Sequence, residues 1–101
     1  LEDYENAKKY YQKTIQINPK HINVYNNLGL IFGIFGKTKE AIKLFKKAIK
    51  INPKNAQAYN NIGNRYKELG EYKKSIEAYN KAIKTNDIKT GPPSMNLIFN
   101  S

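Results

Sequence analysis

Small and apolar side chains recur along this chain at three- and four-residue intervals. One stripe follows the spacing i, i+3, i+4, i+7 and i+8 and consists of Ala41, Leu44, Phe45, Ala48 and Ile49. A second stripe has the same spacing and consists of Ser75, Ala78, Tyr79, Ala82 and Ile83. This period places all members of a stripe on one face of an α-helix. The pattern predicts an all-α chain with helices over residues 3–17, 22–35, 37–51, 56–69 and 71–85.

Glycine and proline mark the ends of these predicted helices. Gly36 and Gly70 stand between helices that must reverse direction, and such a position favours a residue that can adopt a positive φ. Pro19 and Pro53 each follow an asparagine, and a proline disfavours the α conformation of the residue before it. The glycines therefore indicate tight turns within helix pairs, and the prolines indicate turns between successive pairs.

The chain repeats itself every 34 residues. The tripeptide Asn-Pro-Lys begins at residue 18 and again at residue 52. Aligning residues 22–55 with residues 56–89 gives 12 identities in 34 positions, and residues 1–21 match residues 35–55 at 8 positions. We therefore divide the chain into four parts: the second half of a truncated repeat (1–21), two full repeats (22–55 and 56–89) and a C-terminal tail outside the repeat (90–101).

The order of residue types within one unit resembles the tetratricopeptide repeat (TPR). The matching positions alternate aromatic, small and apolar residues and end on a proline; they are Tyr25, Leu28, Gly29, Phe32, Ala41, Phe45, Ala48 and Pro53. The next unit keeps these types but has Asp87 at the position of the proline. The resemblance covers about residues 1–88. It implies antiparallel helix-turn-helix repeats stacked into a right-handed superhelical solenoid.

Close packing explains the small residues of this motif. We expect Gly29 and Gly63 to lie where two antiparallel helices approach most closely, against Ala48 and Ala82 of the partner helix. Large aromatic rings would fill the gaps on either side. Because no single helix could bury its apolar stripe alone, stability must come from the stacking of neighbours.

The composition limits the classes of function. The chain has 101 residues and a formal net charge of +10, from 18 Lys and Arg against 8 Asp and Glu. Lys, Asn and Ile number 17, 14 and 13, and this bias weakens the argument from positive charge to nucleic acid. The length suits one domain, and a start at Leu1 indicates a piece of a longer chain. The absence of cysteine, of a signal peptide and of an apolar run of membrane length favours an intracellular, cytoplasmic protein without a membrane partner.

Catalytic and metal-binding motifs are not found in the sequence. Gly36-Lys37-Thr38 ends like a phosphate-binding loop, but Ile31 stands where that loop requires a glycine. His21 is the only histidine, and with no cysteine in the chain it cannot assemble a zinc site. The sequence therefore predicts no enzyme activity, no cofactor and no metal.

The TPR resemblance also implies a binding surface. In that family the first helix of each repeat lines a concave groove, and the corresponding positions of this chain are Asn23, Asn26, Asn27, Leu30, Ile34, Gln57, Asn60, Asn61, Asn64 and Lys67. Asn27 and Asn61 are equivalent positions, and an amide can both donate to and accept from the backbone of an extended peptide. A packing preference for asparagine at these positions is the alternative explanation.

These features favour a non-enzymatic scaffold that binds an extended peptide or a partner helix in the groove. An alternative is a substrate-recruiting module of a larger enzyme, because Asn27 and Asn61 resemble the amide ladder in the repeat arrays of O-linked N-acetylglucosamine transferases. The carboxylate clamp of chaperone-binding TPR domains is disfavoured, since Gln57 and Asn61 stand where that clamp has Lys or Arg.

Charge and uncovered repeat ends indicate two other kinds of partner. Thirteen of the 18 basic residues lie in the second-helix windows 3–17, 37–51 and 71–85, so a second alternative is a basic surface for nucleic acid or an acidic protein. The compositional bias makes nucleic acid the less favoured of these. The half-repeat at the start and the apolar tail segment Met95–Phe99 predict self-association, or coverage of an exposed face by the tail.

Overall fold

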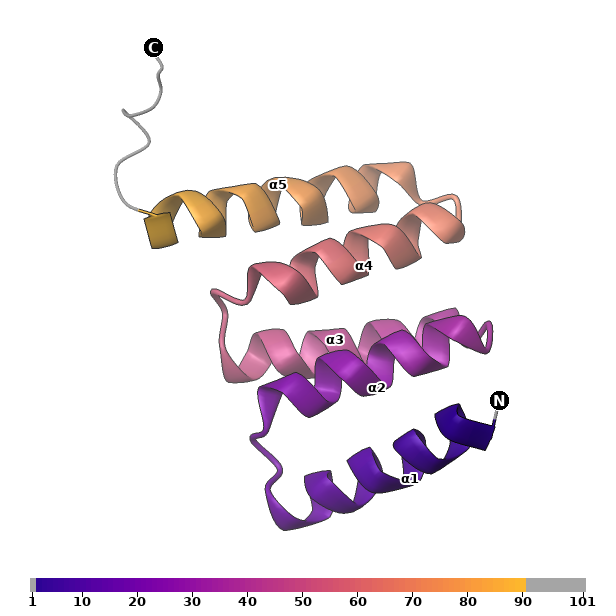
Figure 1. The fold of residues 1–101 in the computed structure, drawn as a ribbon. Coiled ribbons are helices and arrows are strands. Elements are labelled where there is room, and N and C mark those ends of the chain that lie inside the picture. The colour runs from indigo at the N-terminus through magenta and orange to yellow at the C-terminus, as the bar shows by residue number, and fades with distance from the viewer. Residues whose placement is uncertain (1, 91–101) are drawn as a thin grey trace.

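The computed structural model describes residues 2–90, and in this part of the chain it contains helices and turns but no strand. The helices are α1 (Glu2–Ile17), α2 (Ile22–Ile34), α3 (Thr38–Ile51), α4 (Ala56–Glu68) and α5 (Tyr72–Thr90). Consecutive helices run in opposite directions and stack side by side in chain order (Figure 1). The predicted all-α fold of stacked antiparallel helix pairs is confirmed.

The turns within the helix pairs depend on glycine, as the sequence predicts. Gly36 has φ 78° and Gly70 has φ 77°, which is the left-handed region. Around Gly36 the backbone N–H of Lys37 donates to the carbonyl of Phe32 at 2.9 Å, and this bond closes the last turn of α2. The corresponding bond after α4 runs from the N–H of Glu71 to a carbonyl of the last turn, also at 2.9 Å.

The turns between the helix pairs depend on the Asn-Pro-Lys tripeptide. Asn52 has φ −137° and ψ 100°, outside the α region, as expected for a residue before proline. Its Oδ1 accepts a hydrogen bond from the backbone N–H of Lys54 at 3.0 Å. The hydroxyl of Tyr25 donates to the carbonyl of Pro19 at 2.7 Å and so ties the start of α2 to the preceding turn.

Helix α5 is longer than the sequence predicts. It continues to Thr90, five residues beyond the expected end at residue 85. The earlier helices α1 and α3 end just before prolines, and Asp87, which replaces the proline, does not prevent helix continuation. Thr90, assigned to the tail by its sequence, is thus helical, and the remainder of the predicted tail, including Met95–Phe99, lies outside the described residues.

The core forms where successive helix pairs meet. One buried cluster consists of Ala41, Phe45, Ile62 and Ala78, and a second consists of Tyr25, Ala48 and Ala58. Each cluster takes residues from both full repeats, so burial depends on stacking, as predicted.

The close approach at the motif glycines differs from the prediction. The atoms nearest to a Cβ built on Gly29 belong to the ring of Phe45 rather than to Ala48. At Gly63 the nearest atoms belong to the ring of Tyr79 rather than to Ala82. A flat ring reaches the glycine backbone from the partner helix, so the glycines make room for aromatic faces.

The stack is closer on one side than on the other. Helices α2 and α4 contact each other directly, whereas in the described part of the chain no Cα atom of α3 lies within 8 Å of a Cα atom of α5. The same separation holds between α1 and α3. Because the first helices of the repeats are closer together than the second helices, the stack curves toward α2 and α4. We call the side of α2 and α4 the inner side.

Candidate peptide-binding groove

The inner side carries the residues that the sequence predicts as a groove. Most of these side chains are exposed: Asn23, Leu30, Ile34, Gln57, Asn60, Asn64 and Lys67. The equivalent residues Asn27 and Asn61 are half-buried, and Asn26 is buried.

Three of the predicted residues line one cavity at the start of α4. Asn23, Gln57 and Asn60 surround it together with residues of the turn between α3 and α4, and its volume is about 470 Å³. We call it the polar hollow. Asn55, which also lines it, caps α4 by accepting a hydrogen bond from the backbone N–H of Ala58 at 2.8 Å. The other predicted groove residues lie outside this hollow.

Asn26 corrects the predicted site. Its side chain is only 1% exposed, and its Nδ2 donates to Oδ1 of Asn55 at 3.4 Å. Asn60, the equivalent residue one repeat later, is exposed. The turn between α3 and α4, which contains Asn55, covers Asn26, so this side chain is not exposed on the inner side.

The side-chain amides of Asn61 and Asn64 differ in their hydrogen bonds. Nδ2 of Asn61 is buried and has no hydrogen-bond partner among the described residues. Oδ1 of Asn64 accepts a hydrogen bond from the hydroxyl of Tyr79, which fixes this amide against α5. Nδ2 of Asn61 thus has no partner in the described residues, whereas Oδ1 of Asn64 already accepts one hydrogen bond.

Arg65 is a charged residue of the inner side that the sequence analysis missed. Its guanidinium lies against Gly33 of α2, where a side chain would collide with it. The side chain is 18% exposed and forms an ion pair with Glu68 at 3.2 Å. Oε1 of Glu68 also accepts from the hydroxyl of Thr38 at 3.4 Å, so these groups join the two repeats. The signal in the sequence was Gly33, a glycine inside a predicted helix that the repeat motif does not require.

Metal-binding clusters and membrane-spanning helices are both absent from residues 2–90. Between residues 2 and 90 no group of three or more acidic, histidine or cysteine side chains could hold a metal ion. Nor is any helix in this range long and apolar enough to cross a membrane. His21 precedes α2 as its N-cap residue, and its side chain makes no capping hydrogen bond.

The lysines of α3 form one part of the basic surface that the sequence indicates. They are all exposed and comprise Lys39, Lys43, Lys46, Lys47 and Lys50. In the described residues none of them forms an ion pair, because the two salt bridges found there join Arg65 to Glu68 and Lys74 to Glu71. No ion pair within residues 2–90 therefore neutralises the lysine charges of α3.

Three sequence patterns of one repeat family match the chain. Two are described as tetratricopeptide repeat and cover residues 10–43 and 56–87. The third is described as TPR repeat and covers residues 36–70. Together the three matches extend over residues 10–87. A comparison with curated proteins gives no significant match.

Solved structures of MamA are similar to this chain. The crystal structure of MamA has a TM-score of 0.83 at 27% sequence identity, over 87% of this chain and 52% of that chain. The MSR-1 form of MamA has a TM-score of 0.80 at 25% identity, over 86% of this chain and 50% of that chain. The AMB-1 form has a TM-score of 0.78 at 26% identity, over 85% of this chain and 51% of that chain. This chain spans about half the length of the MamA chains that it matches.

Proposed function

Because the chain belongs to the tetratricopeptide repeat family, we propose that it is a non-catalytic scaffold for protein–protein interaction that binds an extended peptide or a partner helix on its inner side. The repeat fold and its similarity to MamA support the general role. The direct contact between α2 and α4 supports the choice of the inner side. Because these helices lie closer together than α3 and α5, they are on the concave side of the curved stack.

The state of Asn61 is the observation that carries this proposal. Its Nδ2 is buried without a hydrogen-bond partner in the described residues, and leaving such a group unpaired costs about 1–3 kcal/mol. Turning Nδ2 toward a peptide carbonyl would give this donor the partner that it lacks among the described residues. Asn27 holds the equivalent position one repeat earlier and is also half-buried. Two amides separated by one repeat suit the backbone of an extended ligand.

Exposed apolar and polar side chains supply further contacts for the ligand. Leu30 and Ile34 are 37% and 56% exposed on α2, and an apolar ligand side chain would bury part of this surface. The polar hollow, with Gln57 and Asn60, offers amide groups at the start of α4. A ligand that crosses α2 and α4 would meet both kinds of contact.

Peptide selection followed by calorimetry tests the proposal. A phage-displayed library of random peptides is selected on the full chain, and the affinity of a selected peptide is then measured. Asn27→Ala and Asn61→Ala are each expected to weaken binding by about 1 kcal/mol, the usual net contribution of one hydrogen bond. The double variant is expected to lose about 2 kcal/mol, or about thirtyfold in Kd.

The matched control lies on the exposed face of α3. Lys43→Ala combined with Lys47→Ala is expected to leave the peptide affinity unchanged, because both side chains belong to the opposite helix of the repeat. If this pair weakens binding and the asparagine pair does not, the inner side is not the binding surface. The basic face of α3 would then become the site.

A further inference from the structure

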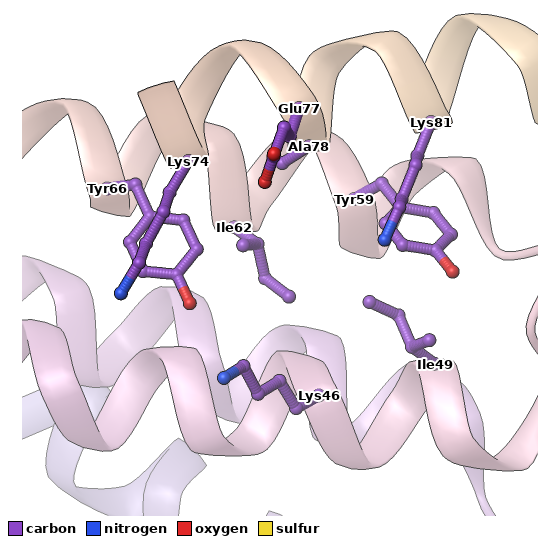
Figure 2. A pocket seen from close by; sticks show the side chains of 9 residues that line it. All are labelled: Lys46, Ile49, Tyr59, Ile62, Tyr66, Lys74, Glu77, Ala78 and Lys81. Carbon is purple, nitrogen blue, oxygen red and sulfur yellow. The ribbon is translucent and has the colours of Figure 1, made fainter. Parts of the chain in front are cut away.

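A cavity of about 430 Å³ opens between α3 and α5, with α4 as its floor (Figure 2). We call it the α3–α5 cavity. Its charged rim consists of Lys46 from α3 and Lys74, Glu77 and Lys81 from α5. Because α3 and α5 are second helices of their repeats, this cavity does not belong to the inner side. It is separate from the groove of the proposed function.

The floor of the α3–α5 cavity is apolar. Ile62 of α4 points into its centre, and Ile49 and Ala78 approach from the two flanking helices (Figure 2). Ile62 and Ala78 are buried members of the core cluster, 4% and 6% exposed. The cavity therefore reaches down to the core between the two full repeats, and a bulky apolar side chain would find apolar contacts there.

One difference between the repeats helps to explain the cavity. Position 78 corresponds to position 44 one repeat earlier, and there the chain has Leu44. Leu44 packs against the buried cluster of Tyr25 and Ala48, so its side chain occupies the corresponding space. Ala78 is shorter by three carbon atoms and leaves that space empty. Together with the wide spacing of the α3 and α5 backbones, which have no Cα atoms within 8 Å of each other in the described residues, this substitution leaves room for the cavity.

The rim is more basic than its equivalent one repeat earlier. The positions that correspond to Lys46 and Lys74 hold Gln12 and Glu40 there. In the described residues neither Lys46 nor Lys81 has an ion-pair partner. Lys74 contacts Glu71 at 3.0 Å, and this hydrogen bond raises the pKa of its ammonium group. Two ammonium groups without an ion-pair partner in the described residues, those of Lys46 and Lys81, thus stand over an apolar floor, an arrangement that complements an acidic ligand.

The lysines also discriminate between a protein and a nucleic acid as ligand. Nζ of Lys74 lies 5.6 Å from the ring centre of Tyr66, and Nζ of Lys81 lies 6.0 Å from that of Tyr59 (Figure 2). Both rings are thus engaged by cations of the chain itself, and a nucleotide base would have to displace these cations in order to stack. The parts of Ile49, Ile62 and Ala78 that line the cavity offer aliphatic contact instead.

We propose that the α3–α5 cavity is a second docking site, which binds an acidic protein segment through one inserted apolar side chain. The inserted side chain lies against Ile62 and Ala78. Acidic residues on either side of it pair with Lys46 and Lys81. Binding at this site is independent of the asparagines on the inner side.

Two capped peptides probe the site by amide chemical-shift mapping on the full chain at low salt. The first is Asp-Asp-Leu-Asp-Asp, and its control, Asp-Asp-Ala-Asp-Asp, lacks the anchoring side chain. The leucine peptide is expected to give saturable shifts at Ile62, Ala78 and Lys81, and the alanine peptide to bind about tenfold more weakly because less apolar surface is buried. Added salt is expected to weaken both peptides.

Variants of the chain separate the two parts of the site. Ala78→Leu, which introduces the residue found at the equivalent position 44, is expected to abolish the saturable shifts. Lys46→Gln and Lys81→Gln are each expected to weaken binding about threefold, and both positions are exposed, so the fold is retained. Asn61→Ala is expected to leave binding of the leucine peptide unchanged, which distinguishes this site from the groove.

Three results would overturn the proposal. The first is the absence of saturable shifts at the cavity residues with the leucine peptide. The second is equal affinity for the leucine and alanine peptides, which would reduce the site to a basic surface. The third is displacement of the leucine peptide by an equimolar amount of polyuridylate, which would assign the surface to nucleic acid.

Discussion

The aromatic ring of Phe45 packs directly on the backbone of Gly29. A Cβ atom built on Gly29 would lie 2.5 Å from Cε1 of this ring, closer than real Cβ atoms approach a neighbour. One repeat later the ring of Tyr79 has the same relation to Gly63, with a distance of 2.6 Å to Cε1. In both repeats the glycine and the ring are 16 positions apart, and this pair closes the contact between the two helices.

The first prediction tests this contact through Gly63→Leu. A leucine side chain would need the space that the ring of Tyr79 occupies, and overpacking of this kind costs about 1–3 kcal/mol or more. We expect α5 to be displaced from α4, with a lower free energy of unfolding in urea and a lower Tm. Asn60→Leu is the control, because Asn60 is exposed on the same helix and its replacement should change stability by less than about 0.5 kcal/mol. Equal stability of the two variants would contradict the assigned packing.

The repeat made most of the fold predictable from the sequence. A 34-residue period with glycine and proline at fixed positions defines where helices end, and the observed boundaries of α2, α3 and α4 differ from the predicted ones by one residue at most. The end of α5 was predicted wrongly because the prediction carried the helix end of the earlier repeat forward by 34 residues. Asp87 stands where the earlier repeats have a proline, and without the proline ring α5 continues.

The candidate site was less predictable, because burial on the inner side depends on how the helix pairs and the turns between them stack. Asn26 and Asn60 occupy equivalent positions, yet one is buried under the turn that contains Asn55 and the other is exposed. The α3–α5 cavity likewise depends on a comparison between Leu44 and Ala78 that becomes informative only when the neighbouring helices are in place. Contacts between residues far apart in the sequence, rather than the local pattern of each helix, determined these outcomes.

The second prediction concerns Gly36 and Gly70. A Cβ on either residue would meet no atom within 4 Å, so any cost of substitution comes from the positive φ of the backbone. Gly70→Ala is expected to lower the free energy of unfolding by about 1–2 kcal/mol. Gly70→Asn should lower it less, because asparagine tolerates the left-handed conformation better. Urea denaturation of both variants measures the difference, and an alanine variant at least as stable as the asparagine variant would exclude this explanation.

The third prediction concerns the side-chain amides of Asn26 and Asn55, which join α2 to the turn before α4. Asn55 caps α4 and also accepts from Nδ2 of Asn26, so Asn55→Ala removes the cap and leaves a buried amide unpaired. We expect a loss of about 2 kcal/mol in the free energy of unfolding. Asn55→Asp keeps an acceptor oxygen and should retain most of the stability at neutral pH. A double-mutant cycle with Asn26→Ala checks the connection, since strictly additive effects would show that the two amides do not interact.

The fourth prediction concerns self-association through the outer face of α5. Ile76 and Ile83 are both 59% exposed there, whereas Ile42, the equivalent of Ile76 one repeat earlier, is 6% exposed. The last repeat thus presents apolar side chains that an adjoining repeat would cover, and exposed apolar surface of this kind favours association. We expect the apparent mass in sedimentation equilibrium to rise with concentration.

The variant Ile76→Glu with Ile83→Glu distinguishes this face from the rest of the surface. Both side chains are exposed, so the helix content measured by circular dichroism should be unchanged. The added charges prevent apolar contact between copies, and the chain should therefore sediment as a monomer.

Tyr10→Glu changes a 66% exposed side chain on α1, at the opposite end of the stack. If copies associate head to tail, this variant also sediments as a monomer, and an equimolar mixture of the two variants pairs again through the one intact contact between them. Wild-type chain that sediments as a monomer at every concentration would contradict self-association; protection of residues 91–101 from hydrogen exchange would then assign the cover of α5 to the tail.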